Sequence, residues 1–101
     1  MQQVDKAMST VSRQVIICNK MGLHARPAMQ FVDIANQYKC NVQVRKGGED
    51  PCDVDGKSIM QMLTLAAIEG TPLTIDADGD DAAAALADLV ALIESGFGEE
   101  D

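Results

Sequence analysis

Hydrophobic and polar residues alternate along the chain in short stretches that predict four strands. Residues 13–18 (RQVIIC) are rich in β-branched side chains, and residues 41–45 and 73–77 alternate apolar with polar positions. Both patterns are typical of strands. A weaker strand, the third in chain order, is expected within residues 49–54, where Pro51 favours an edge position or a bulge.

Apolar residues recur at helical spacing in three other segments. Residues 25–38 place apolar side chains on one face, with Pro27 in the first turn, where its missing N–H costs little. A second helix is predicted to begin near Ser58, a good N-cap residue, and to end at Gly70. The third helix follows a turn at residues 78–80, and its apolar stripe consists of Leu86, Leu89, Val90 and Ile93.

The element order β-α-β-β-α-β-α predicts an α+β open-faced sandwich. We expect a four-stranded, mostly antiparallel sheet with three helices on one face. One domain is expected at residues 13–98, because a chain of 101 residues that is 47% hydrophobic can bury a single core. Residues 1–12 are expected to form a flexible N-terminal extension and residues 99–101 an acidic tail, with fraying from Gly96 onward.

Composition indicates in which compartment the protein works and whether it needs a metal or cofactor. No apolar run approaches the roughly 20 residues that a membrane span needs, and the first residues lack the apolar stretch of a signal peptide. We therefore expect a cytoplasmic protein without membrane insertion. Cys18, Cys40 and Cys52 lie far apart without a CxxC pair, and a single histidine cannot complete a metal site with them. Reduced thiols, no metal and no cofactor are the expectation.

Charge is distributed unevenly along the chain, whose net charge is −8. All eight basic residues lie at or before position 57, together with six acids, whereas residues 58–101 contain ten acids and no base. The acidic total argues against nucleic acid as a partner. The asymmetry leaves the first half of the chain free to bind an anion, while most acids of the second half are interpreted as a solvated surface.

The segment at residues 22–28 (GLHARPA) joins a loop to the first predicted helix and contains His24, the only histidine. A helix N-terminus presents unpaired N–H groups and partial positive charge, which favour an anion. Arg26 adds a cation whose donors suit phosphate oxygens, and a neutral imidazole can attack a phosphoryl donor. Local chemistry leaves two interpretations open: a phosphoryl-accepting histidine, or a surface histidine that only caps the helix.

The chain resembles the HPr family, the histidine-containing phosphocarriers of the bacterial phosphoenolpyruvate-dependent phosphotransferase system. Two motifs carry the resemblance: residues 22–28 match the family's active-site signature, and residues 57–70 (KSIMQMLTLAAIEG) match the signature around its regulatory serine. It covers roughly residues 13–98. The resemblance implies that enzyme I phosphorylates His24 on Nδ1, that Arg26 supports the phosphoryl group, and that the group passes to IIA domains of sugar permeases. A monomer is expected.

Ser58 has a structural and a regulatory interpretation. As an N-cap residue it would bind the first turn of the second helix. The resemblance implies instead that a dedicated HPr kinase/phosphorylase phosphorylates it. A phosphate at this position would be tolerated by the helix end, so its effect would come from negative charge on the partner surface.

The second predicted helix is apolar almost all round. Met62, Leu65 and Ala66 form one stripe, and the other stripe consists of Ile59, Met60, Leu63 and Ala67. A helix on a sheet buries one stripe, so the second is expected to be exposed unless this small domain buries both. The resemblance favours Ile59, Met60 and Leu63 as a partner-binding patch beside His24, and methionine suits a surface that accepts several partners.

Two other functions remain open. The chain could be a nitrogen-type or catabolite-control paralogue that acts mainly as a phosphorylation-dependent regulatory binding protein through His24 or Ser58. A binding module without phosphoryl chemistry is disfavoured by the presence of both His24 and Arg26. Enzymes that need paired acid–base groups or a metal find no support in the sequence, so a carrier without turnover of its own is expected.

Overall fold

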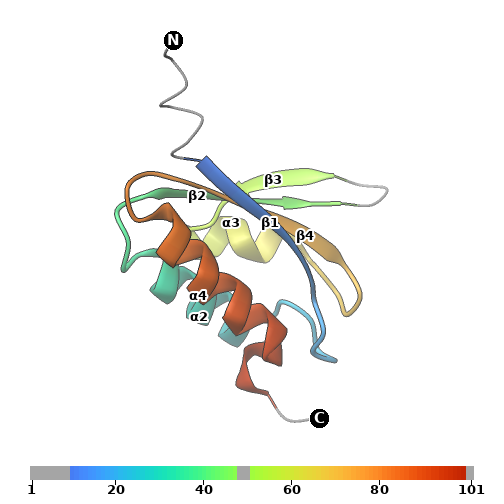
Figure 1. The fold of residues 1–101 in the computed structure, drawn as a ribbon. Helices are drawn as coiled ribbons and strands as arrows, with labels where there is room; N and C mark the ends of the chain where they lie inside the picture. Colours follow the sequence, from blue (N-terminus) through green and yellow to red (C-terminus); the bar gives the residue numbers. More distant parts are fainter. Residues whose placement is uncertain (1–9, 48–50, 100–101) are drawn as a thin grey trace.

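The structure, a computed structural model, describes residues 10–47 and 51–99 as one sheet covered by helices (Figure 1). The strand order is β1-β4-β2-β3, and every neighbouring pair is antiparallel. This arrangement confirms the predicted open-faced sandwich. The elements, in chain order, are β1 (Thr10–Ile16), α2 (Ala25–Ala35), β2 (Asn41–Lys46), β3 (Cys52–Asp55), α3 (Ile59–Thr64), β4 (Pro72–Asp78), α4 (Ala82–Glu94) and the 3-10 helix η1 (Gly96–Gly98).

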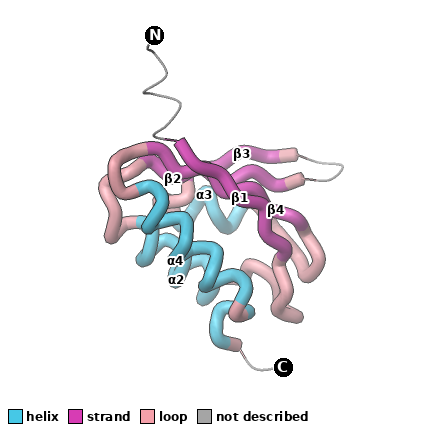
Figure 2. Tube along the Cα trace, in the orientation of Figure 1, coloured by secondary structure: helices cyan, strands magenta, loops and turns pink. Residues whose placement is uncertain are grey.

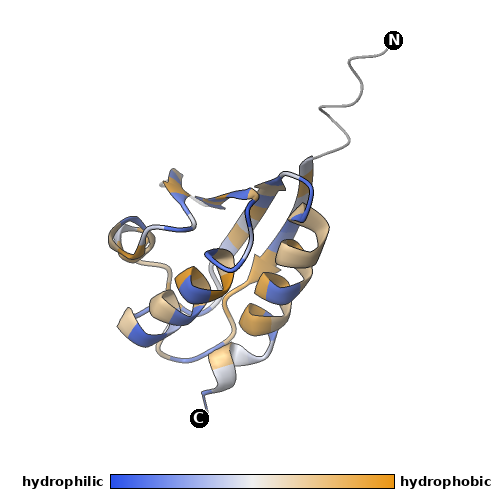
Figure 3. Ribbon diagram, turned by 90° about the vertical axis from the view of Figure 1, so that its left-hand side faces the viewer, coloured by the Kyte–Doolittle hydropathy of each residue, from blue (hydrophilic) through white to orange (hydrophobic). Residues whose placement is uncertain are grey.

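The hydrophobic core lies between the sheet and the helices. Along β2, Val42 and Val44 are buried while Asn41, Gln43 and Arg45 are exposed, as the alternating pattern predicts. Orange and blue bands accordingly alternate along the strands and helices in Figure 3. The largest fully buried side chains come from the loops, the strands and the helices alike, and include Ile17, Phe31, Met62, Leu65, Leu73, Ile75, Leu89 and Ile93.

The first strand begins at Thr10, three residues before the predicted start at Arg13. Thr10 pairs with Asp78 in the ladder, and its Oγ1 donates a hydrogen bond to Asp78 Oδ1 at 3.1 Å. The ladder ends where Ile16 faces Pro72, which has no N–H to donate. Residues 10–12 therefore belong to the folded domain, and the expectation of a flexible extension at residues 1–9 lies outside the described residues.

Two predicted helices are longer than the observed ones. α2 ends at Ala35 rather than Tyr38, because Asn36 takes the C-cap position and its Nδ2 donates to Val32 O at 3.0 Å. α3 ends at Thr64 rather than Gly70, and Ala66 adopts a left-handed conformation with φ of 49°. The predicted helix over residues 58–70 is therefore wrong in its second half.

The backbone carbonyls just after the end of α3 accept hydrogen bonds from other segments of the chain. Leu65 O accepts from Lys46 Nζ at 2.9 Å, and Ala67 O accepts from the backbone N–H of Leu23 at 2.8 Å. The turn also places Ala67 in the core and Ala66 on the surface, the reverse of their predicted helical stripes. Tertiary hydrogen bonds thus replace the helical ones that the sequence pattern suggested.

The C-terminal segment does not fray from Gly96 as expected. Phe97 is 2% exposed, with φ of 59°, and anchors η1 to the core. Glu99 follows it as a half-buried residue rather than part of a solvated tail. The loop before α2 and the segment after α4 lie at the same end of the molecule (Figure 2), while residues 100–101 lie outside the described residues.

Within residues 10–47 and 51–99, no helix is long and apolar enough to cross a membrane. The same residues contain no group of three or more His, Cys, Asp or Glu side chains that could hold a metal ion. The three cysteines are free.

Candidate functional site

The candidate site lies at the N-terminus of α2. His24 occupies the N-cap position in an extended conformation, and its carbonyl accepts from Ala28 N at 3.0 Å. Its side chain makes no capping hydrogen bond. The imidazole is therefore not used to cap the helix, although His24 occupies the N-cap position.

Gly22 fixes the path of the loop that leads to His24. Its φ is +72°, and a Cβ there would lie 2.6 Å from Ala67 O. Only glycine adopts this conformation readily and also fits so close to another backbone segment. The next residue, Leu23, is buried and hydrogen-bonded to Ala67 O, so the histidine loop is attached to the turn that follows α3.

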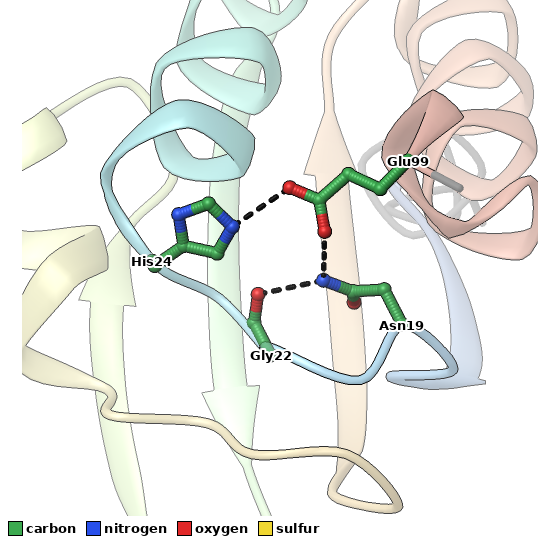
Figure 4. Close-up of polar contacts among 4 residues, drawn as sticks. All are labelled: Asn19, Gly22, His24 and Glu99. Atoms are coloured by element: carbon green, nitrogen blue, oxygen red, sulfur yellow. Dashed lines mark hydrogen bonds and ion pairs between the residues drawn. The ribbon is translucent and has the colours of Figure 1, made fainter. Parts of the chain in front are cut away.

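Three polar side chains meet over this loop (Figure 4). His24 Nε2 lies 2.7 Å from Glu99 Oε2, and Asn19 Nδ2 donates to Glu99 Oε1 at 2.9 Å. Asn19 Nδ2 also donates to Gly22 O at 2.8 Å. Asn19 is 2% exposed, so a buried amide connects the C-terminal segment to the histidine loop.

Glu99 is favoured in its ionised form. The hydrogen bond from Asn19 is the largest influence that holds the pKa of the Glu99 carboxyl below its usual value, and partial burial opposes it. The hydrogen bond from His24 and the positive charges of His24 and Arg26 lower this pKa further. Since an ionised carboxylate only accepts hydrogen bonds, His24 Nε2 must carry a proton and donate it to Glu99.

An open cavity of about 440 Å³ borders this group. Arg26 is exposed at the cavity, and Gln30 Oε1 in its wall is buried without a hydrogen-bond partner among the described residues. The cavity therefore combines a helix N-terminus, a cation and an unsatisfied polar atom beside the imidazole. It is lined by Met21, His24, Arg26, Gln30, Phe97, Gly98 and Glu99.

Ser58 lies apart from this cavity, at the start of α3. Its Oγ accepts from Gln61 N at 3.3 Å, which confirms the predicted N-cap contact. The side chain is half-buried. Ser58 is not among the residues that line the cavity of His24, so the structure does not bring the two predicted phosphorylation positions together in one pocket.

The apolar stripe predicted to be exposed in the second helix is exposed only in part, because Ala67 is buried after the end of α3. Met60 is 73% exposed, Leu63 is 38% exposed and Ile59 is half-buried. Sequence reasoning missed three further exposed apolar side chains in the segments near the histidine loop: Met21, Met29 and Ile68.

Asn19 and Glu99 were also missed by sequence reasoning. Asn19 stands in a loop with no motif of its own, and Glu99 looked like one of several acids in a tail. Only the buried Phe97, an aromatic residue between two glycines near the end of the chain, could have indicated that this segment packs on the domain.

Comparison with known proteins identifies the family. The family model described as the PTS HPr component phosphorylation site matches residues 11–95. Phosphocarrier protein HPr of Pseudomonas aeruginosa is 46% identical over 86 residues, which is 85% of this chain and 93% of that protein. Phosphocarrier protein NPr of Proteus mirabilis is 36% identical over 91 residues, which is 90% of this chain and 99% of that protein.

Solved structures agree with the sequence relatives. HPr-C-His from Thermoanaerobacter tengcongensis superimposes with a TM-score of 0.81 at 41% identity, covering 90% of this chain and 99% of that one. The solution structure of the Bacillus subtilis catabolite repression HPr, Crh, superimposes with a TM-score of 0.60 at 40% identity, covering 82% of this chain and 95% of that one. With this sequence match, this fold and a histidine at the start of α2, the chain belongs to the HPr family of phosphotransferase-system phosphocarriers.

Proposed function

We propose that this chain carries a phosphoryl group on Nδ1 of His24, accepting it from phosphorylated enzyme I and passing it to IIA domains of sugar permeases in the cytoplasm. The observation that carries the proposal is the contact between His24 Nε2 and Glu99 Oε2 at 2.7 Å. Because the Nε2–H group donates a hydrogen bond to the carboxylate, the proton of the neutral ring is on Nε2 and the lone pair lies on Nδ1. Nδ1 is therefore the nucleophile.

The transfer needs no further reactant. Nδ1 attacks the phosphorus of the donor, the new N–P bond forms as the donor's bond to phosphorus breaks, and the donor leaves with its electron pair. Arg26 and the free N–H groups of the first turn of α2 stabilise the oxygens of the transferring group. The same steps in reverse order deliver the group to an acceptor.

The proposal is tested by incubating the protein with phosphoenolpyruvate and enzyme I and mapping the acid-labile phosphate. We expect one labelled site in the wild type and no label in His24→Ala. The outcome that would sink the proposal is a variant that still takes up label. The linkage to Nδ1 is checked by ³¹P NMR of the intact phosphoprotein.

We assign the docking surface to Ile59, Met60 and Leu63 on α3. This assignment is supported by the exposure of the three side chains. A monomeric protein rarely leaves neighbouring apolar side chains in water unless a partner covers them. Enzyme I and the IIA domains would use this patch in turn, and the chain would act as a monomer.

Regulation through Ser58 is the second candidate function. The observation that favours this function is the similarity of the chain to NPr and Crh proteins as well as to HPr proteins. This similarity is compatible with a regulatory paralogue. A phosphate on Ser58 would lie at the start of α3, next to Ile59 and Met60, and would add negative charge beside the docking patch. Incubation with ATP and an HPr kinase/phosphorylase should label wild type but not Ser58→Ala, and label on both would contradict this role.

A further inference from the structure

In the proposed transfer, Glu99 only sets which nitrogen of the free His24 ring carries the proton, and Asn19, which binds Glu99, has no assigned function. Glu99 reaches His24 only because η1, anchored by Phe97, turns the chain back over the histidine loop. Asn19 then holds one carboxylate oxygen while the other oxygen contacts Nε2. A carboxylate placed beside a site for an anionic group opposes that group electrostatically, so its presence calls for a function.

We propose that Asn19 and Glu99 are positioning residues that keep a proton on Nε2 of His24 through the whole phosphorylation cycle, so that the ring departs as neutral imidazole. The inference rests on the proposed function of His24. When Nδ1 forms the N–P bond, the ring becomes a phosphorylated imidazolium that still carries its proton on Nε2. When that bond breaks, its electron pair returns to Nδ1 and the Nε2 proton does not move.

Loss of the Nε2 proton would change the chemistry of the second half of the cycle. The ring would then have to leave as an imidazolate anion, which is a much poorer leaving group than neutral imidazole. The carboxylate of Glu99 opposes this loss because it stabilises the positively charged ring. The expected consequence is a phosphorylated protein that stays reactive to higher pH.

The surroundings of the ring are consistent with this assignment. Among the residues that line the cavity, the charged or titratable groups are His24 in the loop, Arg26 on α2 and Glu99 after η1. Arg26 and Glu99 carry opposite charges, and Glu99 is the one that is hydrogen-bonded to the ring. The turn after α3, packed under the loop, contributes a backbone carbonyl from Ala67 rather than a charge.

Four variants separate this function from general structural support. Glu99→Gln keeps the size of the side chain but removes its charge, and Asn19→Ala leaves the charge but removes the amide that holds it. Glu94→Gln is the matched control for the first change, since Glu94 is exposed and contacts Arg13 at 3.8 Å. Asn36→Ala is the control for the second, since its amide binds backbone carbonyls at the far end of α2.

Each protein is phosphorylated chemically with phosphoramidate, and the lifetime of phosphohistidine is followed by ³¹P NMR across pH. Replacing a charged hydrogen bond should lower the midpoint of the pH profile by about one pH unit in Glu99→Gln, so that the phosphoprotein lives up to roughly tenfold longer between the two midpoints. Asn19→Ala should shift the midpoint in the same direction by less, and both controls should match the wild type. Equal midpoints for wild type and Glu99→Gln would overturn the proposal.

A second measurement does not depend on phosphorylation. ¹⁵N NMR of the free protein should show the neutral ring of His24 protonated on Nε2 in the wild type, with the Nδ1–H form increasing in Glu99→Gln. An unchanged tautomer in this variant would also overturn the inference. Failure of enzyme I to label His24 would instead contradict the proposed function, and the two failures are therefore distinguishable.

Discussion

The two ends of α2 each lie beside a carboxylate whose pKa is lowered, but the hydrogen-bond donors differ. At the far end, Asp81 accepts from the backbone N–H groups of Lys39 at 2.8 Å and Cys40 at 2.9 Å, and these bonds hold its pKa below the ordinary value of 3.8. At the near end, Glu99 accepts from the side chains of Asn19 and His24. One carboxylate joins backbone segments, whereas the other contacts the imidazole of His24.

This difference is what we expect if the contact at Asp81 is structural and the contact at Glu99 serves the function proposed for His24. Backbone donors in a fold cannot turn away, so Asp81 fixes the connection from α2 to β2 against the start of α4. One donor at Glu99 belongs to a titratable side chain, so the strength of this contact depends on the charge of the His24 ring. Equal directions of pKa shift therefore do not indicate equal functions; the type of donor does.

The largest effect is expected at the cation of the near end. Arg26→Ala should slow phosphoryl transfer by about 100-fold, because one fixed donor to a transferring oxyanion typically contributes this much. The measurement is the rate of ³²P transfer from phosphorylated enzyme I. Arg45→Ala serves as the control, because Arg45 pairs with Asp76 on the open face of the sheet at 3.0 Å. A wild-type rate in Arg26→Ala would show that its guanidinium has no such role.

Two glycines test whether the two ends differ in function rather than in rigidity. Gly22 and Gly79 both have positive φ, and a Cβ at either would lie within 3 Å of backbone atoms. Alanine at each should therefore destabilise the fold by about 1–3 kcal/mol or more in urea unfolding. Only Gly22→Ala should also slow transfer in the folded fraction.

The matched control for both glycines is Gly70→Ala. Gly70 has φ of +90°, but a Cβ there would meet nothing within 4 Å. Its loss of stability should be the smallest of the three, because it lacks the steric clash. If Gly79→Ala slowed transfer as much as Gly22→Ala, the two ends would not be functionally distinct.

The two carboxylates should differ in their contribution to thermal stability. At pH 7 we expect Asp81→Asn to lower the Tm more than Glu99→Gln, because an amide NH₂ would face a backbone N–H that cannot move away. The folded-state pKa of Asp81 is depressed, so its contribution is complete above its unfolded-state pKa and is lost as the pH falls through the folded-state value.

Thermal unfolding across pH provides the check. The Tm difference between wild type and Asp81→Asn should close as the pH falls through and below the folded-state pKa of Asp81. A difference that stays constant down to that pH would mean that the Asp81 charge does not stabilise the fold. A larger loss in Glu99→Gln than in Asp81→Asn at pH 7 would reverse the comparison.

The smallest effect on stability is expected at the exposed surface of α3. Met60→Glu should change the free energy of unfolding by no more than about 0.5 kcal/mol, since the side chain is 73% exposed. It should nevertheless weaken binding to enzyme I and to IIA domains in a titration, and Ser58→Asp should do so less strongly. Ala83→Glu, on the exposed side of α4, is the control. Unchanged binding in Met60→Glu would place the docking surface elsewhere.

The local pattern of the sequence determined most elements of the fold. Alternation at Val42 and Val44 predicted β2, helical spacing around Phe31 predicted α2, and the N-cap contact of Ser58 follows from its side chain alone. These features depend on residues close in sequence, which is why pattern and propensity suffice for them. His24 and Arg26 could be predicted as site residues for the same reason, because the motif that contains them is continuous.

The tertiary structure alone decided where α3 ends and what contacts His24. The hydrophobic pattern continues to Gly70, but the helix stops at Thr64. Lys46 Nζ donates to the carbonyl of Leu65, and the backbone N–H of Leu23 donates to that of Ala67. Glu99 lies 75 positions from His24 and reaches it only through the packing of Phe97. Contacts between distant segments leave no periodic signal in the sequence, because they depend on how completed elements pack rather than on neighbouring residues.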